Sequence, residues 1–306
     1  MFNLTFNLSH LAMFRLTALR SNMFRLFSFD LAKEQLKKAR ADKAKLTKPA
    51  NSIGHVHLVG SGPGDAELLT LKAYRLLQTA DVVMYDWLVS PEIVNMIPKN
   101  VEKVFVGKKC GRHSMTQDEI CQLLSERALA GQDVVRLKGG DPSIFGRAAE
   151  EIEHLQQHNI DFAIVPGVTA ASGCAAWSGI PLTHRDCAHS VRFITAHFKS
   201  DEIAADWKNY AESNDTLVFY MGLNKVKHIA DNLISYGKTA TTPMAIVDQG
   251  TTNNQKTYIS NLADIEQVLN SENIIGPALI VVGDVINYQA QVNIDLLHAK
   301  STHAAA

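Results

Sequence analysis

Cysteine is scarce in this chain, which has four in 306 residues: Cys110, Cys121, Cys174 and Cys187. No two of them have the C-x-x-C spacing that is typical of a zinc knuckle or a thioredoxin-like redox site. So few cysteines argue against a disulfide framework and favour reduced thiols, as found in the cytoplasm. We therefore predict a cytoplasmic protein without a metal site.

The chain also lacks long hydrophobic runs, and residues 51–306 carry no net positive charge. No stretch approaches the roughly 18 consecutive apolar residues of a membrane-spanning helix. Residues 1–50 hold ten Lys and Arg but only three Asp and Glu, whereas residues 51–306 hold 20 basic and 28 acidic side chains, a net charge of −8. An acidic body argues against nucleic acid as the main partner. We expect neither a membrane nor nucleic acid as a partner.

The N-terminal segment differs in composition from the rest. We predict that residues 1–52 form an extension that is disordered or partly helical. Its arginines are interleaved with Phe and Leu, and this acid-poor pattern is also typical of an organelle transit peptide. A start site placed too far upstream, with Met13 or Met23 as the true first residue, would explain the same composition.

From residue 53 onward, short apolar runs alternate with segments of helical periodicity, which is typical of α/β folds with largely parallel sheets. A polar cluster near 185–191 suggests a domain boundary there. We therefore predict two α/β domains, 53–190 and 191–290, and then a tail, 291–306. A polar turn between two successive strands of the second domain allows a mixed sheet there. The predicted strands are 56–59, 82–85, 104–106, 133–137, 162–165, 191–196, 216–221, 244–247, 255–260 and 278–282. Helices are predicted at 69–80, 116–131, 225–236 and 262–269, and after residues 148 and 166.

Two common nucleotide-binding motifs are absent. Gly60, Gly62 and Gly64 follow the first strand, but the dinucleotide fingerprint needs glycine at 65, where Asp65 stands. Pro63 also lacks the backbone N–H that a pyrophosphate would use. The chain has no P-loop motif either. A nicotinamide or flavin site is disfavoured, whereas a nucleoside without phosphates still fits.

The most informative segment is Arg136 to Arg147, with the sequence RLKGGDPSIFGR. It places two glycines, an acid and a proline between a strand and a helix, where open α/β folds bind ligands. A tight turn that serves folding alone is the alternative. We assign Phe145 to packing, and we expect the solvent-exposed face of the following helix to carry Glu150, Glu151, His154 and His158.

Several segments, taken together and in order, resemble the tetrapyrrole methylase family, and within it the uroporphyrinogen-III C-methyltransferases. The resemblance covers residues 54–287. The matching segments are VGSGPGD at 59–65, YD at 85–86, VGK at 106–108, RLKGGDPSIFGR at 136–147, PGVTAA at 166–171, GIPLTHR at 179–185, YMG at 220–222, GTT at 250–252 and PALI at 277–280.

This resemblance implies two α/β domains with a ligand cleft between them, a homodimer, and S-adenosylmethionine as methyl donor, with S-adenosylhomocysteine as product. Without the resemblance, Met221 reads as a core residue at the end of a strand. The residues implied to bind the donor are Pro63, Gly139, Gly140, Asp141, Ile144, Thr169, Ala170, Met221 and Gly250.

The implied substrate is uroporphyrinogen III, methylated at positions 2 and 7 to give precorrin-2 in sirohaem or cobalamin synthesis. Asp86 matches the family's proton-accepting position and Lys108 its paired acid, although Asp86 would otherwise be interpreted as a loop-capping acid. For the eight substrate carboxylates, the candidates are Arg147, Arg185 and His184, because arginine binds carboxylates through two hydrogen bonds.

The 50 residues before the matching region are too short for the dehydrogenase–chelatase half that some relatives carry, so we expect the stand-alone form. Three alternatives remain. The chain could methylate a later corrin intermediate, sense S-adenosylmethionine without catalysis, or be a nicotinamide oxidoreductase.

Overall fold

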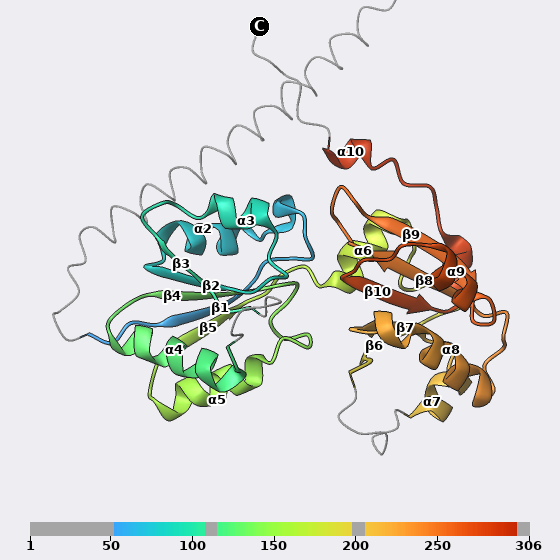
Figure 1. Cartoon of the computed structure of the whole chain (residues 1–306), viewed down its shortest axis with the longest axis horizontal. Coiled ribbons are helices and arrows are strands. Elements are labelled where there is room, and N and C mark those ends of the chain that lie inside the picture. Colours follow the sequence, from blue (N-terminus) through green and yellow to red (C-terminus); the bar gives the residue numbers. More distant parts are fainter. Residues whose placement is uncertain (1–51, 108–114, 198–205, 299–306) are drawn as a thin grey trace, which may run out of the picture. The chain divides into compact units, whose positions relative to one another are not determined.

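Two five-stranded β-sheets form the framework of the chain (Figure 1). The computed structural model describes residues 52–107, 115–197 and 206–298. Strands and helices alternate along them, and all these elements belong to one compact unit that begins at Ile53. The predicted α/β fold class is confirmed.

The first sheet has the strand order β3-β2-β4-β1-β5, and every neighbouring pair is parallel. Parallel strands need crossover connections, and helices supply them. The strands are β1 (Val56–Gly60), β2 (Val82–Tyr85), β3 (Glu102–Phe105), β4 (Val134–Lys138) and β5 (Phe162–Val165). The helices are α2 (Leu71–Thr79), α3 (Pro91–Met96), α4 (Gln117–Leu129) and α5 (Ala148–Gln157).

Helices cover both faces of this sheet, α2 and α3 on one side and α4 and α5 on the other (Figure 1). Side chains alternate along β2, so that Val82 and Met84 pack toward α4 and α5 while Val83 packs toward α2 and α3. Arg136 of β4 is the register partner of Met84 and therefore lies on the α4–α5 side. One strand thus places two cationic residues, Arg136 and Lys138, under a helical layer.

The second sheet is mixed, with the order β6-β7-β10-β8-β9. Only β6 and β7 are parallel, because β10 runs antiparallel to both its neighbours and β9 antiparallel to β8. The mixed sheet that the sequence allowed is present. Its strands are β6 (Val191–Thr195), β7 (Thr216–Tyr220), β8 (Pro243–Asp248), β9 (Lys256–Asn261) and β10 (Ala278–Val282). The helices are α7 (Trp207–Glu212), α8 (Val226–Ser235) and α9 (Ile265–Ser271).

Helix α6 (Ala170–Ser178) precedes the second sheet in sequence but packs on it. Its residues Ala171 and Cys174 share a buried cluster with Val218 of β7 and Val247 of β8. The core around the second sheet therefore extends upstream of residue 190, where we predict the boundary between the domains. That boundary remains a prediction.

The capping box and the closing glycine predicted for α4 are confirmed: Thr116 and Glu119 cap the helix reciprocally, and Gly131 follows its end with φ +85°. Three short helices were not predicted, namely α3, α7 and α10 (Asp295–His298), since four to six residues give no clear period. Among the described residues, no helix has the length and apolarity that crossing a membrane requires.

Candidate active site

A cavity of about 630 Å³ opens at the carboxyl ends of β1, β2 and β4 and is closed from the other side by residues of the second sheet. Every residue predicted to bind the donor lines it, as do Asp86 and Arg147. Several other residues that line it were not predicted as site residues: Trp87, Leu88, Gln117, Lys138, Cys174, Tyr220, Asn224 and Ile275.

Three glycines bring the backbone close together on the donor side. A Cβ on Gly60 would lie 2.6 Å from the carbonyl oxygen of Gly140 and from the amide nitrogen of Gly167. A Cβ on Gly167 would lie 2.2 Å from that same oxygen. These distances exclude any side chain, so glycine is required where the turns after β1, β4 and β5 meet. The result is a smooth backbone cradle beside the cavity.

Asp141 ties two of these turns together. Its Oδ1 accepts a hydrogen bond from the Ser143 amide at 2.8 Å, and its Oδ2 accepts one from the Gly167 amide at 3.0 Å. Each carboxylate oxygen can accept a further hydrogen bond. Asp141 therefore organises the cradle and can still receive a hydroxyl or amino group from a ligand.

The opposite wall comes from the end of β7. Met221 has φ +56° and is 57% exposed, so it is no core residue and its thioether faces open space. Next to it, the Tyr220 hydroxyl lies 2.7 Å from Thr169 Oγ1 and accepts a hydrogen bond from the Ala171 amide at 3.1 Å. Burial raises the pKa of Tyr220, so the phenol is neutral and holds the first turn of α6 against β7.

Phe145 does more than the predicted packing. Its ring centroid lies 5.1 Å from that of Tyr220, but the side chain remains 40% exposed and lines the cavity. The backbone at Phe145 is left-handed, with φ +53°. The predicted packing of Phe145 is confirmed by its contact with Tyr220, and the residue also lines the cavity.

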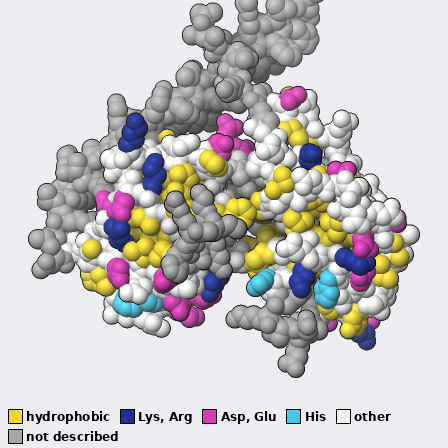
Figure 2. Space-filling view, viewed as in Figure 1, with side chains coloured by type: hydrophobic (Ala, Val, Ile, Leu, Met, Phe, Trp, Pro, Cys, Tyr) yellow, Lys and Arg dark blue, Asp and Glu magenta, His cyan; other side chains and the backbone are white. Residues whose placement is uncertain are grey.

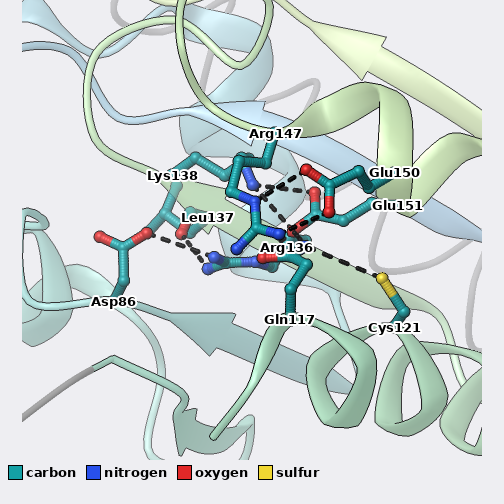
Figure 3. Close-up of polar contacts among 9 residues, drawn as sticks. All are labelled: Asp86, Gln117, Cys121, Arg136, Leu137, Lys138, Arg147, Glu150 and Glu151. Carbon is teal, nitrogen blue, oxygen red and sulfur yellow. Dashed lines mark hydrogen bonds and ion pairs between the residues drawn. The ribbon is translucent and has the colours of Figure 1, made fainter. Parts of the chain in front are cut away.

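Asp86 stands directly after β2 and is held at both oxygens. Its Oδ1 accepts a hydrogen bond from the Leu88 amide at 3.1 Å, and its Oδ2 lies 3.3 Å from Nη2 of Arg136 (Figure 3). The side chain is 21% exposed. The loop-capping contact that the sequence offered as an alternative is real, and Asp86 also lines the cavity.

Beneath Asp86 lies a buried charged cluster (Figure 3). Both Glu151 oxygens accept from Lys138 Nζ, at 2.8 and 2.9 Å, and Oε1 also accepts from Arg136 Nε at 3.1 Å. Glu151 is fully buried, so its predicted place on the exposed face of α5 was wrong. The reason is the pair of cations on β4, which a carboxylate from α5 must balance. Burial is the largest cause that lowers the pKa of Lys138, and the charge of the neighbouring Arg136 lowers it further.

The residues predicted to bind the substrate carboxylates lie in different places, some at the cavity and some away from it. Arg147 lines the cavity, more than half exposed, with Nε 2.8 Å from Oε1 of Glu150. His184 and Arg185 do not line it: the His184 ring stacks on Tyr288 with centroids 3.8 Å apart, and Arg185 is exposed. Lys108 lies outside the described residues.

Surface charge agrees with the composition. On the face shown in Figure 2, Lys and Arg side chains are interspersed with Asp and Glu over the described residues. No continuous basic surface of the kind that binds nucleic acid is visible on that face. Among the residues that line the cavity, Arg136, Lys138 and Arg147 are basic.

Comparisons with known proteins identify the family of this chain. Residues 55–266 match the family model of the Tetrapyrrole (Corrin/Porphyrin) Methylases. The chain is 51% identical to Siroheme synthase 2 of Yersinia enterocolitica over 80% of its own length and 51% of that protein's. It is 48% identical to siroheme synthase of Pseudomonas putida over 85% of its length and 55% of that protein's. The chain thus spans about half the length of these relatives.

Two solved structures are also similar. Uroporphyrin-III C-methyltransferase from Thermus thermophilus, complexed with S-adenosylhomocysteine, is 40% identical with a TM-score of 0.66. That match covers 76% of this chain and 99% of the Thermus chain. Cobalt precorrin-4 methyltransferase, a cobalamin biosynthetic enzyme, is 27% identical with a TM-score of 0.70, over 78% of this chain and 99% of that one. With the family match covering most of the chain and the cavity at the strand ends, this chain belongs to the tetrapyrrole methylases and is a methyltransferase.

Proposed function

We propose that the chain transfers methyl groups from S-adenosylmethionine to carbons 2 and 7 of uroporphyrinogen III, which gives precorrin-2. The observation that carries the proposal is that one cavity gathers all nine residues assigned to the donor together with Asp86 and Arg147. The 40% identity to a uroporphyrin-III C-methyltransferase supports the choice of substrate.

The residues present fit the donor. Gly139 and Gly140 let backbone approach a nucleoside, Asp141 offers acceptors for a ribose hydroxyl, and Met221 offers a polarisable contact. When bound, the donor supplies an electrophilic methyl group on a sulfonium and leaves as S-adenosylhomocysteine. Because this leaving group is already good, the protein's main task is to position the substrate carbon.

Asp86 then has a defined task. A pyrrole carbon of the substrate forms the new bond to the methyl carbon while the bond from sulfur to methyl breaks, and the methylated ring must lose a proton. The Asp86 carboxylate faces the cavity and accepts that proton. We assign the paired acid to Lys108, on the family resemblance alone.

The substrate carboxylates call for cations around the cavity. Arg147 lines it and has donors beyond those used by Glu150. Arg185 and His184 do not line the cavity, and we propose that they reach the substrate in a homodimer. We also propose that the protein acts in the cytoplasm. Light scattering of the purified chain tests the dimer, and a monomer would remove these two residues from the site.

The deciding experiment is incubation with uroporphyrinogen III and methyl-labelled S-adenosylmethionine under anaerobic, reducing conditions. Two labelled methyl groups per tetrapyrrole, at carbons 2 and 7, are expected. Binding of the labelled donor without transfer would contradict the proposal and favour a sensor of S-adenosylmethionine.

Asp141→Ala should weaken S-adenosylhomocysteine binding about ten- to a hundredfold, because hydrogen bonds to a charged acceptor contribute about 1.5–3 kcal/mol. Calorimetric titration measures the affinity. Glu67→Ala, which removes an acid exposed on the surface, serves as the control and should bind normally. Unchanged affinity in Asp141→Ala would exclude Asp141 from the donor site.

A further inference from the structure

Four charged side chains form a continuous chain of contacts that ends at Asp86 (Figure 3). Lys138 and Arg136 both bind Glu151, and Arg136 continues to Asp86. The order Lys138, Glu151, Arg136, Asp86 alternates in sign and sums to zero charge. Only Asp86, at the open end, has appreciable exposure, 21% against 5% or less for the other three.

Arg136 has every branch of its guanidinium committed. Nε donates to Glu151, Nη1 to the Leu137 carbonyl at 3.0 Å and Nη2 to Asp86. A planar group held at three points in a buried site has little freedom to rotate. The Asp86 carboxylate therefore meets a fixed donor on one oxygen, and the Leu88 amide fixes the other.

Glu151 is what fixes Arg136. Its carboxylate is fully buried and additionally lies 3.4 Å from the Gln117 side-chain amide. A buried carboxylate with that many donors is held in place. Without Glu151, the Arg136 guanidinium would lose the partner of its Nε. Arg136 and Lys138 would then be two buried cations, with Asp86 as the remaining carboxylate of the cluster.

We propose that Glu151 is a positioning residue, which acts through Arg136 to hold the Asp86 carboxylate in the orientation that accepts the substrate proton. This proposal rests on the proposed function, in which Asp86 is the base. Glu151 itself touches neither donor nor substrate, since it is fully buried beneath the wall that Arg136 and Lys138 form.

The test is a double-mutant cycle with Glu151→Gln and Asp86→Asn. Glu151→Gln keeps the volume of the side chain and one acceptor but removes the charge. We expect kcat to fall about ten- to a hundredfold, as for a misplaced reacting group, with unchanged affinity for S-adenosylhomocysteine. In the Asp86→Asn background the same change should have no further effect on kcat, because the group that it positions is already gone.

The outcomes are distinguishable. An equal loss in both backgrounds, or an unchanged kcat, would overturn the positioning role, because a merely structural residue acts additively. Normal turnover in Asp86→Asn alone would instead contradict Asp86 as base. Glu153→Gln removes an exposed charge from the same helix and should leave kcat unchanged. If Glu151→Gln does not fold, Arg136→Lys takes its place in the cycle, since one ammonium cannot bridge Glu151 and Asp86 as the guanidinium does.

Discussion

Asp86→Asn should lower kcat about a hundred- to ten-thousandfold, the range by which a positioned general base accelerates a reaction. Asparagine has nearly the same shape and can still accept the hydrogen bond from the Leu88 amide, so the turn after β2 should keep its structure. What disappears is the carboxylate that we propose as the acceptor of the proton from the methylated ring. Binding of S-adenosylhomocysteine should be unaffected, because the residues assigned to the donor lie on other turns.

Single-turnover experiments with uroporphyrinogen III measure this loss, and calorimetry measures donor binding. Asp161→Asn is the matched control, since Asp161 is an exposed acid just before β5, at the amino ends of the parallel strands. Its kcat should equal that of the wild type. If Asp86→Asn retained wild-type turnover, Asp86 would have only its loop-capping role.

The turns on one side of the cavity could be predicted from sequence because their information is local, whereas the assignment of residues to the donor came from the family resemblance. Glycine-rich turns directly after apolar runs mark strand ends, and the carboxyl ends of parallel strands share one edge of a sheet. Gly140 and Asp141 therefore lie beside Pro63 in the structure, although their turns are far apart in the chain. Whether these residues bind the donor stays a prediction until binding is measured.

The charged cluster could not be predicted in this way. Glu150 and Glu151 are adjacent acids at the start of one helix, and nothing local tells them apart. Which of them is buried depends on the side of β4 from which Arg136 and Lys138 project, and this is decided by the pairing of β4 with β1 and β2. A strand that carries two cations among apolar residues was the available signal for a buried acid.

His184 shows a different limit. Its segment matches the family pattern, and the resemblance assigns it to the substrate, but in a single chain its ring stacks on Tyr288. A sequence motif does not say whether a residue reaches the site of its own chain or that of a second copy. The oligomeric state of the chain decides this question. Light scattering therefore tests the assignment of Arg185 and His184.

Removing one partner from the buried cluster should also destabilise the first sheet. Glu151→Ala should lower the free energy of unfolding by about 3–5 kcal/mol at pH 7, since it leaves buried cations without their partner. Urea titrations measure this loss. Glu153→Ala should change stability by less than about 0.5 kcal/mol, as expected for an exposed position.

The loss in Glu151→Ala should shrink as the pH rises, and the sign follows from Lys138. Burial lowers the pKa of Lys138 from its ordinary 10.5, and removing Glu151 lowers it further. A lysine with a folded-state pKa below its unfolded value destabilises the fold at neutral pH, and this cost fades as the pH rises through the folded pKa toward 10.5. The difference between variant and wild type should therefore be smaller at pH 9.5 than at pH 7. Part of it should persist, because Arg136 stays charged. Adding Lys138→Met to Glu151→Leu should recover the part of the loss that Lys138 causes and abolish this pH dependence, since apolar side chains of similar volume can replace a buried ion pair. An equal loss at both pH values would mean that lost packing, and not the uncompensated charge of Lys138, is the cause.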